Sequence, residues 1–414
     1  MNTELKPNIH WVGYVDWSVR DFHSYNTEHG ATYNSYLIQD EKTVLIDTVK
    51  GPFAHQLLNN IRELTTLDKI DYIVCNHAEP DHSGSLPGIV KALPNATLLC
   101  NDKCRNALSG YFDISNWKIK IVSPDTPLKI GSKTLQFLDT PMVHWPESMF
   151  TYIPEEKLLF SMDAFGQHLA SSVRFDDQWD LSDTMREAKT YYANIVVPYN
   201  RQVQKTLEEA AKLKIEMIAP SHGLIWRKHI PEIVTAYDNW SSSTYKPRVV
   251  IVYDSMWEST TQLAETILDG VNDRSQNIDV QLLHARKCSL TRIATEMLDT
   301  PAVAFGSATL NAQMMPAMSA VLTYLKGLKF SKKAAFAFGS SGWGSGGAEQ
   351  ISKWFEEMQW DMVAPLARSR WRPAPEFKTL CFEAGKLLAK QAIALSGSDV
   401  PPGEKTGEKT GETS

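Results

Sequence analysis

Short apolar runs alternate with helical stretches through the first 240 residues of the chain. Polar and turn-forming residues bound each run, and a short bounded run of this kind is typical of a strand. Between residues 183 and 214 the pattern becomes long and helical. This part of the chain therefore predicts a mixed α/β fold with strands at Thr43–Ile46, Asp71–Val74, Ala96–Leu99, Leu135–Leu138, Lys157–Phe160 and Met217–Ala219.

From residue 248 onward the alternation is more regular. An apolar run at 248–253 is followed by a loop and by a helical pattern over 260–272, and a last helix is predicted at 376–395. Continuous apolar strands that alternate with helices are typical of a parallel sheet with helices on both faces. Further strands of this sheet are predicted at 280–283, 301–305 and 334–338.

A polar break at 241–247, Ser-Ser-Ser-Thr-Tyr-Lys-Pro, separates the two patterns. Because 414 residues are many for a single core, we expect two domains and place them at 1–246 and 247–396. The remaining segment, 397–414, repeats Gly-Glu-Lys-Thr and has almost no apolar residues. We predict that it is a disordered tail.

Composition excludes several classes of protein. Hydrophobic residues make up 43% of the chain, and a net charge of -6 gives no electrostatic reason to expect a nucleic acid or an anionic membrane as partner. The first residues lack the pattern of a secretory signal, and no apolar stretch is long enough to cross a bilayer, so we expect a cytoplasmic protein. The five cysteines include no CxxC pair, which argues against a disulfide framework and against a thiolate-ligated metal.

The densest group of possible metal ligands follows the strand predicted at 71–74. Residues 76–82 read Asn-His-Ala-Glu-Pro-Asp-His, which places His77, Glu79, Asp81 and His82 on one loop at a strand's carboxyl end. The alternative interpretation is a solvated polar loop with a capping aspartate. Ligand density favours metal binding.

Three later residues, His144, Asp163 and His222, each lie just past an apolar run. Strand ends converge at one rim of a sheet, so we expect these side chains to join the loop. Four histidines and three carboxylates are enough for two metals, with Asp163 placed to bridge ions about 3.5–4 Å apart. Imidazole and carboxylate without thiolate suit iron or manganese better than a soft-ligand zinc site.

A second candidate site begins after the strand at 248–253. Ser255, Ser259 and Thr260 put hydroxyl groups at the entrance to a helix, where free N–H groups and the helix dipole attract a phosphate. An ordinary helix cap is the alternative. No lysine of the Walker type is present, which disfavours a nucleoside triphosphate.

Two further loops, 306–311 and 340–347, are predicted at the carboxyl ends of later strands. Cofactors bind at such ends in open α/β sheets. Small residues let the backbone approach a flat ring, and Trp343 is able to stack on it. The alternative is a pair of flexible glycine loops.

The order His77-x-Glu79-x-Asp81-His82, then His144, Asp163 and His222, resembles the flavodiiron proteins. The resemblance covers nearly the whole chain except the tail. It implies an αββα metallo-β-lactamase-like sandwich followed by a flavodoxin-like, doubly wound, five-stranded parallel sheet. Hydrolases of the first fold usually carry histidine where this chain has Glu79, and the harder carboxylate favours iron held for redox chemistry.

The resemblance also implies specific site residues. One iron would be bound by His77, Glu79, His144 and Asp163, and the other by Asp81, His82, Asp163 and His222, although some members leave the position of His82 unbound. His168 and Tyr191 (or Tyr192) resemble catalytic groups of the substrate pocket, and Asp47 and His23 would lie close by. The implied FMN contacts are Ser255, Met256, Trp257, Ser259, Thr260, Gly306, Ser307, Ala308, Thr309, Leu310, Asn311, Ser340, Ser341, Gly342, Trp343 and Gly344, with Glu258 facing solvent and Trp343 between flavin and iron.

The implied activity is scavenging: reduced FMN passes electrons to a di-iron site that reduces O2 to water or couples two NO into N2O and water. Members of the family form a head-to-tail homodimer, in some cases a dimer of dimers. The electron donor would be a separate protein such as rubredoxin, or a reduced deazaflavin. Two alternatives stay open: a zinc metallo-hydrolase with a fused flavodoxin module, and an electron carrier with structural metals.

Overall fold

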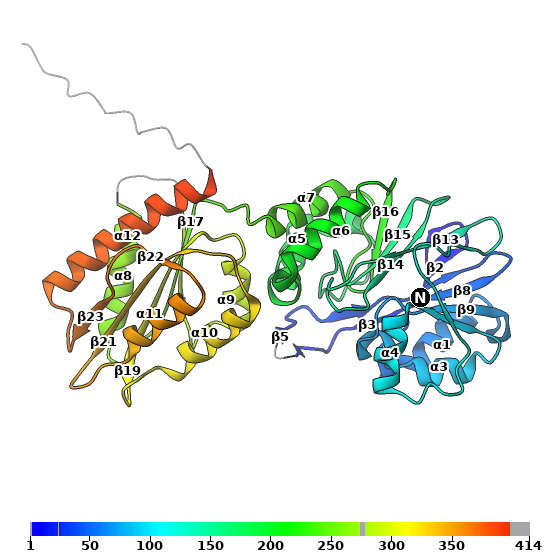
Figure 1. Ribbon diagram of the computed structural model, residues 1–414, viewed down its shortest axis with the longest axis horizontal. Helices are drawn as coiled ribbons and strands as arrows, with labels where there is room; N and C mark the ends of the chain where they lie inside the picture. Colours follow the sequence, from blue (N-terminus) through cyan, green and yellow to red (C-terminus); the bar gives the residue numbers. More distant parts are fainter. Residues whose placement is uncertain (1, 24, 274–277, 398–414) are drawn as a thin grey trace, which may run out of the picture. The chain divides into compact units, whose positions relative to one another are not determined.

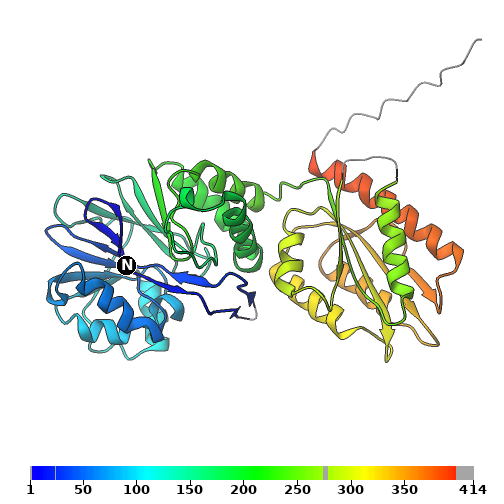
Figure 2. The same ribbon diagram turned by 180° about the vertical axis from the view of Figure 1, so that it is seen from behind.

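The computed structural model describes residues 2–23, 25–273 and 278–397. The chain divides into two compact units, residues 1–242 and 243–414, which are drawn in Figures 1 and 2. The domain boundary predicted at residue 246 lies a few residues beyond this division. Apart from Gly397, the predicted tail at 397–414 lies outside the described residues.

The first unit contains two sheets packed face to face. The larger has the order β1-β2-β7-β8-β9-β10-β11 and the smaller the order β12-β13-β14-β15-β16. The larger sheet consists of β1 (Thr3–Lys6), β2 (Ile9–Trp11), β7 (Tyr36–Ile38), β8 (Thr43–Ile46), β9 (Ile70–Val74), β10 (Thr97–Cys100) and β11 (Ile119–Ile121). The smaller consists of β12 (Leu128–Lys129), β13 (Thr134–Asp139), β14 (Met149–Ile153), β15 (Leu158–Met162) and β16 (Met217–Pro220).

Side chains from both sheets, among them Ile46, Val74, Leu135 and Phe160, form one buried cluster between them. A second cluster joins the outer face of the larger sheet to helices that include Leu57 and Leu108. These helices are α1 (Ala54–Arg62), α3 (Leu86–Ala92) and α4 (Asp102–Tyr111), while Figure 1 shows α5 (Leu181–Tyr191), α6 (Asn200–Ala210) and α7 (Ile230–Ser241) beside the smaller sheet. The layers run helix, sheet, sheet, helix, which confirms the predicted αββα sandwich.

Parallel pairing brings the carboxyl ends of several strands to one rim. β9 pairs in parallel with β8 and β10, and β15 pairs in parallel with β16. The short helix α2 (Pro80–Ser83) follows β9 directly. Two separate two-stranded antiparallel sheets were not predicted: β3 (Tyr14–Asp16) pairs with β6 (Ala31–Tyr33), and β4 (Asp21–Phe22) pairs with β5 (Tyr25–Asn26).

The second unit has one sheet of order β18-β17-β19-β21-β22, in which these strands are parallel. β17 (Arg248–Asp254), β18 (Asp279–His284), β19 (Ala302–Leu310) and β21 (Ala334–Ser341) fill four positions. The fifth position is split: β22 (Asp361–Met362) pairs with the start of β21, and β23 (Ala367–Arg370) pairs with its end. This confirms the predicted doubly wound parallel sheet.

Helices cover both faces of this sheet (Figure 2). α8 (Ser259–Val271) buries Leu263, Ile267 and Val271 on one stripe, in a cluster that also contains residues of α12 (Pro375–Ser396). The two helices approach closely at Gly270, where a Cβ atom would lie 2.0 Å from the carbonyl oxygen of Phe382 and would not fit. The remaining helices are α9 (Leu290–Met297), α10 (Pro316–Leu328) and α11 (Gly347–Glu357), and the strand β20 (Gln313–Met314) pairs with β19.

Two predicted elements differ from the structure. The strand predicted at 301–305 continues to Leu310 because its end pairs with β20, so most of the predicted loop at 306–311 is strand. The helical pattern at 183–214 is interrupted between α5 and α6 by a π-helical turn, Tyr192–Val196, and a 3-10 turn, Val197–Tyr199. Pro198 lies at this break and lacks the N–H that a continuous helix needs. Within the described residues, no helix has the length and apolar character needed to cross a membrane.

Candidate metal centre and flavin cavity

Asn76 anchors the ligand-bearing loop after β9. Its backbone N–H and its side-chain amide donate to the two carboxylate oxygens of Asp47 at 2.7 and 2.8 Å, and its amide oxygen accepts from Thr151 at 2.8 Å. Asp47 itself has a φ of 51°, in the left-handed region. Asp47 therefore fixes the start of the loop, and the ligand residues that follow are held to both sheets.

The first group of possible ligands consists of His77, Glu79, His144 and Asp163, whose ligand atoms all lie within 4.8 Å of one another. His77 Nε2 lies 3.1 Å and His144 Nε2 lies 3.3 Å from Glu79 Oε2. His144 Nε2 also lies 2.9 Å from Asp163 Oδ2. Three strand ends, those of β9, β13 and β15, supply these residues.

The second group consists of Asp81, His82 and His222. Asp81 Oδ2 lies 3.3 Å from His82 Nε2 and 3.1 Å from His222 Nε2. His82 Nε2 lies 3.0 Å from the other oxygen of Asp163, Oδ1. Asp163 thus directs one oxygen to each group, as expected of a bridging ligand.

Several of these atoms are buried without a hydrogen-bond partner, namely Asp81 Oδ1, His82 Nε2 and Asp163 Oδ1. His82 and Asp163 are close enough for a hydrogen bond but are not aligned for one. Buried polar atoms of native proteins nearly always have a partner. Two cations, one in each group, would supply it, and the nitrogen and oxygen donors suit hard ions such as iron or manganese.

The electrostatics of the cluster also favour bound cations. Burial lowers the pKa of His77, but hydrogen bonds to Glu147 and Glu79 more than offset it and raise that pKa to about 10. At His144, hydrogen bonds to Asp163 and Glu79 outweigh burial in the same way, and the pKa is raised to about 10. The carboxylates therefore attract positive charge to this site, and metal ions would replace the protons.

Two further groups orient the histidines and were not predicted. His77 Nδ1 lies 2.8 Å from Glu147 Oε1, which also accepts the backbone N–H of Ala78. His222 Nδ1 donates to the carbonyl oxygen of Thr32 at 2.6 Å. Such contacts fix each imidazole ring so that its Nε2 atom is free to bind a metal ion. The only hint of this role in the sequence is that Glu147 lies three residues after His144. The backbone carbonyl of Thr32 leaves no mark in the sequence.

The structure brings His168, Tyr191 and His23 beside the two groups. The buried ring of His168 lies 5.0 Å from Tyr191 and 4.9 Å from His222, and burial lowers its pKa, so the imidazole is neutral. His23 Nε2 lies 2.8 Å from Glu79 Oε1. Tyr192 instead donates to Asn200 and packs on Tyr237. Tyr191, rather than Tyr192, therefore faces the cluster.

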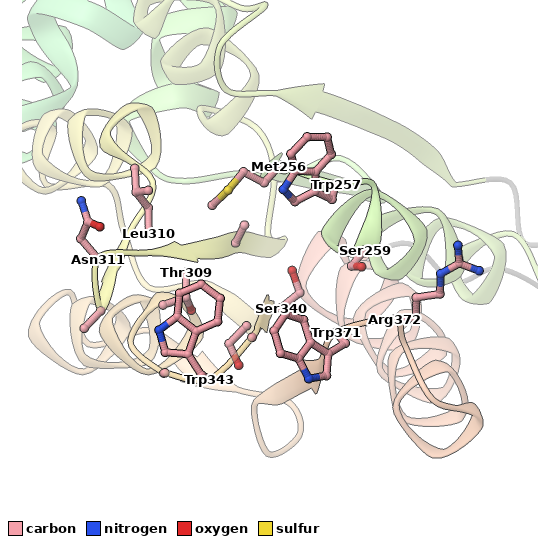
Figure 3. Close-up of a pocket in the computed structure, with 15 residues that line it drawn as sticks. Met256, Trp257, Ser259, Thr309, Leu310, Asn311, Ser340, Trp343, Trp371 and Arg372 are labelled. Carbon is pink, nitrogen blue, oxygen red and sulfur yellow. The ribbon is translucent and has the colours of Figure 1, made fainter.

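The second unit contains a cavity of about 760 Å³ at the carboxyl ends of β17, β19 and β21 (Figure 3). Twelve of the predicted flavin contacts line it: Met256, Trp257, Ser259, Ala308, Thr309, Leu310, Asn311, Ser340, Ser341, Gly342, Trp343 and Gly344. Ala312, Trp371 and Arg372 also line it and were not predicted. In Figure 3, Met256 and Trp257 lie on one side, and Trp343 and Trp371 on the other.

The other four predicted contacts, Ser255, Thr260, Gly306 and Ser307, do not line the cavity. Thr260 is buried with its hydroxyl 2.8 Å from that of Ser340. A Cβ atom at Gly306 would lie 2.2 Å from the ring of Phe338, so this glycine serves packing within the sheet. The hydroxyl of Ser307 accepts the N–H of Met315 at 2.8 Å. Ser255 is buried, and its hydroxyl has no partner.

The cavity suits a flat ring that carries a phosphate. Glu258, exposed as predicted, precedes α8 with a φ of 64°, and the free N–H groups of the first helical turn attract an anion. At the opposite wall, a Cβ atom at Gly342 would lie 2.8 Å from the ring of Trp371, which itself lies 5.9 Å from the ring of Trp343. The ring of Trp371 thus limits the width of the cavity beside the loop that contains Gly342.

Comparison with known proteins covers both units. Residues 31–223 match the family model of the ODP family beta lactamase, and residues 251–385 match that of flavodoxin. The chain is 40% identical to a nitric oxide reductase from Moorella thermoacetica, over 93% of this chain and 97% of that protein.

Two solved structures are similar over both units. One is the flavodiiron protein from Giardia intestinalis, with a TM-score of 0.93, 39% identity, and coverage of 97% of this chain and 99% of that one. The other is rubredoxin oxygen:oxidoreductase from Desulfovibrio gigas, with a TM-score of 0.93, 34% identity, and coverage of 96% and 100%.

Proposed function

The chain belongs to the flavodiiron protein family, and from this premise we propose that it reduces nitric oxide, dioxygen or both with FMN and a pair of irons. It is an oxidoreductase. The observation that carries the proposal is the position of Asp163, whose two oxygens face two separate groups of buried ligands. A single zinc would not need both groups.

His77, Glu79 and His144 would hold one iron, Asp81, His82 and His222 would hold the other, and Asp163 would bridge them. When bound, the irons would supply two adjacent redox centres for small diatomic molecules, and FMN would supply their electrons. Glu79 supports iron over zinc because a carboxylate is a harder ligand than the histidine found in hydrolases of this fold.

Neighbouring residues of the chain would orient these ligands. Glu147 holds His77 through Nδ1, so that Nε2 is free to bind metal. His168 is neutral and buried and lies beside Tyr191 and His222. We propose that Tyr191 and His168 hydrogen-bond the substrate and pass on the protons that reduction of NO or O2 consumes.

The substrate and donor are proposed from the relatives. The relative from Moorella thermoacetica is named a nitric oxide reductase, and the one from Desulfovibrio gigas is named for rubredoxin and oxygen. We propose a rubredoxin-like electron donor for this chain, because the similar protein from Desulfovibrio gigas is named for rubredoxin.

We also propose that the working enzyme is a head-to-tail homodimer, in which the flavin of one subunit serves the irons of the other. Dilution until the chain is monomeric, as followed by mass photometry, should then abolish turnover while iron and FMN stay bound. Full turnover in a demonstrated monomer would contradict this arrangement.

The deciding experiment is a comparison of NO and O2 consumption with chemically reduced rubredoxin, with iron, zinc and FMN measured on the same sample. We expect two irons and one FMN per chain and sustained consumption of at least one of the two gases. Zinc without iron, together with no consumption of either gas, would instead support the zinc hydrolase with a fused flavodoxin module.

A further inference from the structure

The loop between β17 and α8 contains a buried charge that FMN binding alone does not explain. Asp254 ends β17 and is fully buried, and its Oδ2 atom has no hydrogen-bond partner. The next residue, Ser255, is 5% exposed, and its hydroxyl is also without a partner. Both residues begin the loop to which we assign the flavin phosphate. A carboxylate is unexpected there, because it repels an anion.

Arg286 is the cation that lies against this carboxylate. Its Nε atom donates to Asp254 Oδ1 at 2.8 Å, and its Nη2 atom donates to the backbone carbonyl of Ser255 at 2.5 Å. Arg286 lies in the turn after β18, and this turn is tied to β17 because the N–H of Ala285 donates to the carbonyl of Tyr253 at 2.8 Å. The guanidinium therefore holds two consecutive residues of the loop from the neighbouring strand.

The bond to Ser255 also sets the direction of the next N–H group. The carbonyl and the N–H of a trans peptide point in opposite directions. Because Arg286 holds the carbonyl of Ser255, the N–H of Met256 points to the side opposite Arg286. Met256 lines the flavin cavity, and an N–H fixed at this point of the loop adds to the donors at the start of α8.

We propose that Arg286 is a positioning residue for the flavin phosphate: it neutralises Asp254 and orients the Ser255–Met256 peptide, so that the loop distinguishes FMN from riboflavin. This inference rests on the proposed function, because it takes FMN as the ligand of the cavity. Removal of Arg286 alone would leave an uncompensated buried carboxylate beside the phosphate. Removal of the charges of both Asp254 and Arg286 would leave no such carboxylate.

The test is the binding of FMN and of riboflavin to the full-length chain, with its flavin removed and its metals in place, followed by quenching of flavin fluorescence. For Arg286→Gln we expect the Kd of FMN to rise about tenfold or more and that of riboflavin to change less than about twofold. The double variant Asp254→Asn/Arg286→Gln should recover part of the FMN affinity, because it removes the uncompensated charge but does not restore the bond to Ser255. Arg286→Lys, which keeps the charge but not both contacts, should recover part of it.

Arg292→Gln is the matched control, because Arg292 is an exposed arginine on α9 of the same unit. It should change neither dissociation constant. Equal weakening of FMN and riboflavin by Arg286→Gln, or further weakening in the double variant, would show that Arg286 only supports the fold and would overturn the inference. Wild-type chain that binds neither flavin would instead contradict the proposed function.

Discussion

The two candidate sites are built in opposite ways. In the first unit, seven titratable side chains converge, and six of them are buried while His144 is half-buried. In the second, small residues and three tryptophans line an open cavity, and Trp257 and Trp343 are 87% and 89% exposed. The first site depends on the chemistry of each titratable residue, whereas a cavity lined by small and aromatic residues depends on shape. Single substitutions should therefore act more strongly in the first unit.

The largest effect is expected from Asp163→Asn, because Asp163 contacts both ligand groups. The amide removes the negative charge from the bridging position, and turnover of NO or O2 should fall about a thousandfold or more, which is about 4 kcal/mol of barrier. Iron per chain, measured by emission spectroscopy, should fall below half of the wild-type value. FMN content should stay unchanged.

Asp125→Asn is the control for this substitution, since Asp125 is exposed in the first unit. It should leave turnover and iron content at wild-type values. Turnover of Asp163→Asn within about threefold of wild type would contradict the bridging role and, with it, the view that side-chain chemistry dominates this site.

A smaller effect is expected from Glu79→His, which places the ligand usual in hydrolases of this fold. The change replaces an anionic oxygen by a neutral nitrogen, so the preference of the site should shift from iron toward zinc and turnover should fall about a hundredfold. Competition between equal concentrations of the two metals, followed by metal analysis, measures the shift. An unchanged ratio of iron to zinc would show that Glu79 does not set the choice of metal.

Glu147→Gln should act more weakly, because Glu147 orients His77 without being placed in either ligand group. Loss of such a contact typically weakens metal binding about 10- to 100-fold, and a chelator competition would measure it. Glu208→Gln, an exposed residue on α6, is the control and should bind metal like the wild type. If Glu147→Gln binds metal as tightly as the control does, Glu147 does not orient His77 for metal binding.

The smallest effect is expected at the flavin cavity, and it sharpens the comparison. A Cβ atom at Gly342 would meet the ring of Trp371 at 2.8 Å, whereas a Cβ atom at Gly344 would meet nothing within 4 Å. Gly342→Ala should therefore raise the Kd of FMN about tenfold, while Gly344→Ala should leave it unchanged. Fluorescence titration measures both, and equal values would mean that shape at this wall does not control binding.

The same contrast explains what could be predicted from the sequence. His77, Glu79, Asp81 and His82 stand together after an apolar run, so the sequence alone predicted a cluster of possible ligands, and the structure places them in two such groups. Glu147 was missed because a single glutamate in a loop looks like a solvated surface residue. Its contact with His77 spans 70 positions along the chain, and only the pairing of the strands reveals it.

The flavin cavity was harder to predict because its walls depend on strand ends. Gly306 and Ser307 were expected to contact the flavin, but β19 extends through them and turns them into the packed interior of the sheet. Trp371 and Arg372 were missed because the parallel pairing of β23 with β21 brings them to the cavity. The flavodoxin-like rhythm of strands and helices was predictable, since it follows from buried apolar runs.

The division of the outermost strand into β22 and β23 has a consequence for how the cofactor enters and leaves. Trp371 directly follows β23, which pairs with β21 on one side, so only a few hydrogen bonds hold this wall of the cavity to the sheet. Amides of β23 should exchange with deuterium well before those of β17 and β19, which are paired on both sides. We expect this wall to open locally and release the flavin while β17, β19 and the helices packed on them stay folded.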